Sequence, residues 1–308
     1  MNQSNYTRGM GFIPPMPISL ANMQTNVAAS TLQPWNAATS YALDAEVIDP
    51  TSRIIYRSLV AANQGNDPLK TPSKWQPRGV ENRLRMVDAS MGSFTENPES
   101  IIVTITPERV VTDLALLGVR ARFITLTVTD PVDGVLVPAT TVSMQRPSGN
   151  SHWGYFFSPI EFKSRLLISG LPAYSRAQIK VEIHNPGATA RCAELVLGRS
   201  IWLGNTKWRP SLGFDDFSEK TRDDWGGWKV TEGAYSDRLK LEVLVQSTAY
   251  ERTREQVIAV RAKPVVWIGS RGIDALATYG YVTAFEQVLA SHGYSDCTLT
   301  IEGLETRE

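Results

Sequence analysis

Four carboxylates lie close together in the stretch FDDFSEKTRDDWGGW. Two carboxylates held about 5–10 Å apart in a cleft can hydrolyse a glycosidic bond, one as the acid and the other as nucleophile or base. Lysine and arginine are interspersed among these acids, however, as they are on a solvated face of mixed charge. We therefore expect a polar loop rather than a catalytic pair from these residues: Asp215, Asp216, Asp223 and Asp224.

The sequence carries no other signature of catalysis. It contains no G-x-S-x-G, S-x-x-K, P-loop, H-E-x-x-H or C-x-x-C pattern, and GSRG at 269–272 lacks the spacing of a nucleophile elbow. The histidines His152, His184 and His292 are far apart in the chain, whereas metal sites and catalytic triads need ligands that converge. We expect surface or capping histidines, no metal, no cofactor and no hydrolytic activity.

Composition narrows the class of partner. The 308 residues include 31 Lys and Arg and 31 Asp and Glu, so the formal net charge is zero and a nucleic-acid partner is not expected. The N-terminal stretch is broken by prolines and does not read as a signal peptide, and no apolar run is long enough to span a membrane. Cys192 and Cys297 are expected to be buried free thiols.

Most of the chain alternates apolar and polar residues with the period of a β-strand. Residues 53–60 place Ile54, Tyr56 and Ser58 on one face. Residues 123–130 and 135–144 form a predicted hairpin, because the DPVDG between them supplies turn residues. Similar runs recur at short intervals between about residues 95 and 198, which favours a β-sandwich.

One helix is predicted near residue 250. Thr248 and Glu251 have the spacing of a capping box, and Pro264 would stop the segment. Residues 282–293 have spacing that allows a short helix, but they also continue a strand-like alternation, and we favour the strand.

The changes in pattern divide the chain into five segments. We expect an N-terminal leader at 1–33, a small aromatic-rich β module at 34–79, a linker at 80–94, the β-sandwich at 95–198 and an α+β domain with one helix at 199–308. The fold class is mainly β, and the chain is long enough for several cores.

The 34–79 module is too short to support an ordinary core, and large aromatic rings could supply the missing apolar area. Its residue order resembles the small chitin- and cellulose-binding modules of secreted glycoside hydrolases. Those modules stack exposed rings on sugar just after the position of Tyr56, where this chain has SLVAANQG, and the glycine that usually precedes Asp44 is Leu43. The aromatics therefore either fold the module or bind carbohydrate: Trp35, Tyr41, Tyr56 and Trp75.

A second resemblance covers nearly the whole chain, from Phe12 to Leu304. PPMPISLANMQTNVA, the module, ENRLRMVD and a sandwich that closes with AELVLGR are similar, in that order, to structural proteins of the tail tip or baseplate of tailed bacteriophages. The stretches KPVVWIG and CTLTIEGLE look like the β-rich, single-helix domains that tail-tube and distal-tail proteins use to build rings. The middle segment also resembles galactose-binding-like jelly rolls, although fold likeness alone does not confer binding.

These resemblances imply a non-enzymatic virion protein, made in the host cytoplasm, that joins other tail proteins and a homo-oligomeric ring. The alternative is a carbohydrate-binding protein or accessory module, and the partner could then be a cell-surface glycan. Aromatic residues are common anchors at interfaces. The candidate subunit contacts, which could equally pack inside their own domain, are Trp208, Phe214, Trp225 and Trp228.

Overall fold

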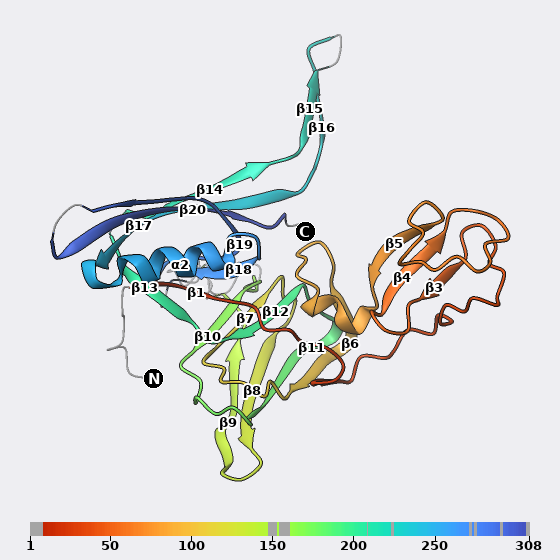
Figure 1. Cartoon of the computed structure of the whole chain (residues 1–308), viewed down its shortest axis with the longest axis horizontal. Helices are drawn as coiled ribbons and strands as arrows, with labels where there is room; N and C mark the ends of the chain where they lie inside the picture. The colour runs from red at the N-terminus through yellow and green to blue at the C-terminus, as the bar shows by residue number, and fades with distance from the viewer. Residues whose placement is uncertain are drawn as a thin grey trace.

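The computed structural model confirms a mainly β protein, with several sheets and little helix (Figure 1). A β-barrel built from both ends of the chain packs on a β-sandwich, and a three-stranded module and a two-stranded arm extend from them. The structure describes residues 9–146, 153, 161–207, 209–222, 225–270, 273, 276–289 and 292–305.

The barrel is a seven-stranded antiparallel sheet that closes on itself. The strand order is β13-β1-β18-β19-β20-β17-β14, and β13 also pairs with β17, so six strands form the closed part and β14 continues beyond it. Its strands are β1 (Gly9–Ile13), β13 (Ile201–Thr206), β14 (Ser211–Asp216), β17 (Tyr235–Gln246), β18 (Val265–Ile268), β19 (Ala277–Val288) and β20 (Tyr294–Gly303).

The first strand of the barrel comes from the segment that we expected to be a leader. All five residues of β1 are buried, and β1 pairs with β13 on one side and with β18 on the other. A Cβ added at Gly11 would lie 2.6 Å from the carbonyl oxygen of Ile201, so this position requires glycine. The segment 1–33 is thus not a separate leader: its partners lie some two hundred residues away, and local pattern cannot reveal them.

The sandwich consists of a five-stranded and a three-stranded sheet. The first has the order β2-β6-β11-β8-β9 and the second β10-β7-β12. The predicted hairpin is β8 and β9, with Asp130 opposite Gly134 at the turn. The strands are β2 (Met23–Thr25), β6 (Thr95–Ile105), β7 (Asp113–Leu117), β8 (Phe123–Asp130), β9 (Gly134–Ser143), β10 (Leu166–Ser169), β11 (Gln178–Cys192) and β12 (Glu194–Gly198).

The three-stranded sheet joins the sandwich to the barrel, and its strands β7 and β12 are buried on both faces. Leu114 and Leu116 of β7 pack into the sandwich core, whereas Ala115 and Leu117 pack into a second cluster that contains Ile13 and other barrel residues. This explains why every residue of β7 and β12 is buried, rather than every second one. We call this shared cluster the seam: Ile13, Met91, Ala115, Leu117, Ala193, Val196, Val266, Ile268 and Tyr279.

The remaining elements are short. The module is the sheet β3-β4-β5, comprising β3 (Glu46–Ile48), β4 (Ile54–Ser58) and β5 (Trp75–Val80), and is followed by the 3₁₀ helix η1 (Asn82–Val87). The arm carries β15 (Glu219–Arg222) and β16 (Trp228–Thr231), which pair with each other.

The predicted helix is α2 (Tyr250–Val260), which follows the 3₁₀ turn η2 (Ser247–Ala249). Val257 and Val260 face the barrel core. The expected capping box does not form, because the residue before the helix is Ala249, which makes no side-chain capping bond. Residues 277–288 form a strand, as favoured. Both cysteines are free and buried, as expected.

We predict that Phe12→Ala lowers the free energy of unfolding by about 3–5 kcal/mol, the usual cost of deleting a buried phenylalanine. Phe12 is fully buried, and its ring lies 5.1 Å from that of Trp267. Urea denaturation measures the change, and Gln24→Ala, an exposed substitution on β2, is the control. Equal stability of the two variants would show that β1 is not needed for the barrel.

Candidate functional site

The aromatic residues of the module meet in one small core. Tyr56 and Trp75 are buried with Val47, and Trp35 and Tyr41 pack against them. The indole N–H of Trp75 donates a hydrogen bond to the backbone oxygen of Asn66 at 2.9 Å, and the ring of Tyr41 meets that of Trp75 edge to face at 5.5 Å. These contacts supply the core that the three short strands could not otherwise have.

The polar end of Tyr41 is also bound within the module. Its hydroxyl accepts a hydrogen bond from the amide of Asn36 at 2.7 Å, and its backbone pairs with Asn63. The exposed large apolar side chains of residues 34–79, all described, are instead leucines: Leu43, Leu59 and Leu69. In the stretch just after Tyr56, where the carbohydrate-binding modules carry stacking rings, the exposed apolar side chain is Leu59.

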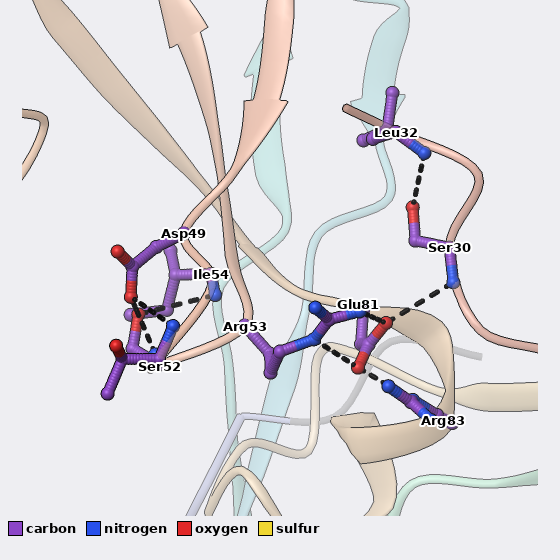
Figure 2. Close-up of polar contacts among 9 residues, drawn as sticks. Ser30, Leu32, Asp49, Ser52, Arg53, Ile54, Glu81 and Arg83 are labelled. Carbon is purple, nitrogen blue, oxygen red and sulfur yellow. Dashed lines mark hydrogen bonds and ion pairs between the residues drawn. The ribbon is translucent and has the colours of Figure 1, made fainter. Parts of the chain in front are cut away.

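A buried carboxylate ties the module to the rest of the chain (Figure 2). The Glu81 side chain is fully buried. It accepts two hydrogen bonds from the Arg53 guanidinium, at 2.8 and 2.9 Å, and one from Arg83 at 2.6 Å. The amide of Ser30 donates a fourth at 3.2 Å. Glu81 therefore links the β3–β4 turn, the start of η1 and the N-terminal segment.

The ionised form of Glu81 is strongly favoured. Burial alone would raise its pKa, but the hydrogen bonds and charge of Arg53 and Arg83 outweigh burial and lower the pKa to about 2. Arg53 adopts a left-handed backbone conformation, with φ of 59°, which costs a non-glycine residue on the order of 1 kcal/mol. Its two bonds to Glu81 hold it in that conformation.

The second candidate site is the arm, which we define as residues 211–222 and 225–231. Figure 1 shows it rising away from the barrel. Apolar side chains stand out along its length, and the exposed fractions are 67% for Phe214, 95% for Trp225 and 64% for Trp228. The guanidinium of Arg222 lies over the ring of Trp228, 4.6 Å from its centroid. Three of the four predicted interface residues are thus on this surface, and Trp208 lies outside the described residues.

Each of the two described aspartates at the base of the arm has its own cationic partner. Asp215 forms an ion pair with Arg238 at 3.2 Å. Asp216 accepts hydrogen bonds from Lys220 at 2.6 Å and from Ser218, and these contacts lower its pKa. Asp223 and Asp224 lie outside the described residues. Asp215 and Asp216 therefore belong to a surface of mixed charge, as expected, and are not arranged as an acid and a base in a cleft.

The histidines do not converge where they are described. His184 stacks on Phe123 with ring centroids 4.8 Å apart and lies 3.3 Å from Glu182, while His292 is exposed. His152 lies outside the described residues. Within the part of the chain that the structure covers, no group of three or more His, Cys, Asp or Glu could hold a metal ion.

Sequence reasoning missed a second buried carboxylate, at the seam. Glu194 is 4% exposed, and the Tyr279 hydroxyl of the barrel lies 3.5 Å from its Oε1. Burial, and then the charge of Asp88, raise the pKa of Glu194 to about 9, so it is protonated at neutral pH. The only signal in the sequence is a glutamate inside the apolar run CAELVLG, which pattern alone assigns to a solvent face.

The chain was compared with known families and proteins. No protein-family model matches it, and no curated protein matches it significantly. No helix among the described residues is long and apolar enough to cross a membrane.

We predict that Trp75→Ala unfolds the module, because loss of a buried tryptophan costs about 3–5 kcal/mol, comparable to the whole stability of so small a unit. Trp35→Ala should have a smaller effect, since Trp35 is half-buried. Limited proteolysis should cut Trp75→Ala between residues 31 and 83, and Leu69→Ala, at an exposed position, is the control. Protease resistance combined with loss of polysaccharide binding would instead identify a sugar platform.

We also predict a pH effect from Glu194. The folded protein keeps a proton on Glu194 between its ordinary pKa of 4.5 and about 9, whereas the unfolded chain releases it. The free energy of unfolding therefore falls as pH rises through this window. Glu194→Gln, which is neutral at all pH, should make melting temperature less dependent on pH and should stabilise the protein at pH 8. An unchanged pH profile would contradict a neutral Glu194.

Proposed function

We propose that this chain is a non-enzymatic structural component of a bacteriophage tail tip or baseplate, which assembles with copies of itself and with other tail proteins. The observation that carries the proposal is the arm, which exposes Trp225, Trp228 and Phe214. Its tip strands β15 and β16 pair only with each other among the described residues.

Physical chemistry argues against such an arm in isolation. A two-stranded hairpin is at best marginally stable in water, and soluble proteins seldom expose large contiguous apolar surface unless it binds something. Every residue of β15 and β16 is exposed, so the arm has no core of its own. A protein partner that covers its aromatic side chains would both stabilise the arm and use their apolar area for affinity.

The rest of the molecule suits a scaffold. The sandwich and the barrel share the seam and cannot easily move apart, and Arg165 beside β10 also bonds Asp237 and the carbonyl of Ala277 in the barrel. A rigid body with a projecting arm can fix the position of one subunit relative to the next. Together with the resemblance to tail proteins, this supports a place in the virion after synthesis in the host cytoplasm.

The alternative is a carbohydrate-binding role for the module, with a cell-surface glycan as the partner. Trp35 and Tyr41 are only half-buried, so part of each ring is accessible to a ligand. Pull-down with chitin and cellulose tests this role, and Tyr41→Ala compared with wild type shows whether the rings are used. If neither polymer retains the wild-type protein, chitin and cellulose are excluded as ligands.

We predict that Trp225→Ala and Trp228→Ala reduce assembly while leaving the monomer stable. Both side chains are exposed, so their removal creates no cavity, whereas truncation of an interface anchor commonly costs 2 kcal/mol or more in binding. Oligomer mass by mass photometry and incorporation into phage particles are compared with melting temperature. Trp153→Ala, which removes an indole that is 73% exposed elsewhere, is the control. A lower melting temperature with normal assembly would place both residues in the domain core.

A further inference from the structure

A pocket of about 290 Å³ lies where the module meets the sandwich. The end of β5, the 3₁₀ helix η1 and the segment that leads into β6 surround it, and every residue that lines it is among the described residues. Two of them are arginines, Arg78 on β5 and Arg85 on η1. A water molecule occupies about 30 Å³ in the liquid, so the pocket has room for a small ion and an organic group attached to it.

The two guanidinium groups keep hydrogen-bond donors that no described protein group uses. Arg85 donates one hydrogen bond, from its Nε to the backbone oxygen of Val80 at 3.3 Å. The Nε of Arg78 lies 3.9 Å from Oε1 of Glu46, farther than the roughly 2.7–3.2 Å of an ordinary N–H···O bond. Among the described residues, the terminal nitrogens of both arginines have no acceptor. A guanidinium carries several N–H donors in a planar fork, so donors remain for a ligand.

Further positive charge lies behind the pocket. The guanidinium of Arg191 is stacked over the ring of Phe94, 3.1 Å from its centroid, and Phe94 lines the pocket. The Nε of Arg191 is buried and has no hydrogen-bond partner among the described residues. Burial lowers the pKa of Arg191, and the positive charge of nearby Arg120 acts in the same direction. Arginines from β5, η1, β11 and the segment before β8 thus gather at this junction.

The carboxylates that contact these arginines are fewer than the arginines. Glu96 lines the pocket, 3.8 Å from the Nε of Arg191. Asp88 lies within electrostatic range of Arg85, but its own loop binds both of its oxygens, at 3.0 and 2.6 Å. With Glu46, three carboxylates oppose four guanidinium groups, so one positive charge is in excess, although the net charge of the chain is zero. The pocket therefore favours an anion.

We propose that this pocket binds a phosphate group, either as the free ion or on a small organic ester. Two guanidinium groups that each donate in pairs match the several oxygens of a tetrahedral anion better than the two oxygens of a carboxylate. A phosphate monoester also carries a charge of about −1.5 to −2 near pH 7, which is more than a carboxylate carries. The inference is independent of the proposed assembly role.

The lining leaves space for the organic part of an ester. Apart from its chain neighbours, no atom lies within 4 Å of a Cβ built at Gly79, which lines the pocket beside Arg78. Phe94 is half-buried, and the part of its ring that lines the pocket can contact the carbon atoms of a ligand. The pocket is therefore larger than the anion alone requires.

Phosphate bound at this place would strengthen the junction between module and sandwich. Arg78 belongs to the module, whereas Arg85 belongs to η1, whose Met86 lies in the sandwich core. A phosphate that contacts both arginines therefore joins the two parts. A ligand that binds only the folded protein stabilises it by mass action, so phosphate should raise the melting temperature.

Isothermal titration calorimetry of the full chain, in a phosphate-free buffer of low ionic strength, tests the proposal with inorganic phosphate and with glycerol 3-phosphate. We expect saturable binding to one site. Arg78→Gln and Arg85→Gln should each weaken binding about 10-fold or more, the usual effect of losing a charge-assisted hydrogen bond. Arg109→Gln, which removes the same charge at an exposed position of the sandwich, is the control and should change the affinity by less than about twofold.

Glu96→Gln provides a variant with the opposite effect. It removes a negative charge from the pocket lining and should tighten phosphate binding about 3-fold, a gain that loss of packing cannot produce. Melting temperatures without ligand show whether each variant is folded. If one arginine variant does not fold, the other and Glu96→Gln still decide the question.

Three results would overturn the proposal. The first is the absence of both saturable heat and a rise in melting temperature at about 10 mM phosphate. The second is an Arg109→Gln variant that binds as weakly as the pocket variants, which would indicate general attraction by charge. The third is acetate that binds as tightly as phosphate. Tighter binding of glycerol 3-phosphate than of inorganic phosphate would identify an ester as the ligand, whereas equal affinities would identify the free ion.

Discussion

Closure of the barrel is the constraint on which the rest of the structure depends. β1 lies between β13 and β18, so the strand at residues 9–13 must find partners near residues 201–206 and 265–268. Without it the barrel would have two open edges, each with unpaired backbone groups. Because β1 runs directly into the segment that supplies β2 of the sandwich, closure also fixes where the sandwich begins. Module and sandwich are therefore insertions between the first two barrel strands of the chain.

Two buried glutamates join the parts in opposite charge states. Glu81 is surrounded by two guanidinium groups and is ionised, with a pKa of about 2. Glu194 is buried beside Tyr279 of the barrel, and burial and the charge of Asp88 keep it neutral, with a pKa of about 9. At Glu81 the two arginines outweigh the effect of burial, whereas at Glu194 burial is the largest effect and the charge of Asp88 adds to it. The contacts of Glu81, which join the module to the rest of the chain, are therefore lost only in strong acid. The contact of neutral Glu194 between sandwich and barrel is weakened at high pH.

The arm differs from the rest of the protein in the exposure of its large aromatic side chains. Each of the sandwich, the barrel and the module has a buried apolar core, and in the module Tyr56 and Trp75 belong to it. Along the arm, Phe214, Trp225 and Trp228 face outward. Exposed aromatic area on a thin hairpin is costly in water and useful in an interface. The physical contrast between the arm and the body is what supports the proposed assembly role.

The sequence by itself determined the elements whose signals are local. Alternation with a period of two gave the mainly β class, the turn residues after Asp130 placed the β8–β9 hairpin, and apolar spacing with a terminal proline located α2. It could not determine β1, because five residues with no alternation acquire strand structure only from partners far along the chain. The sequence also could not distinguish buried from exposed aromatic side chains, because Trp75 and Trp225 are both flanked by polar residues and turns. Only tertiary packing decided that Trp75 lies in a core while Trp225 projects into solvent, and only packing set the opposite charge states of Glu81 and Glu194.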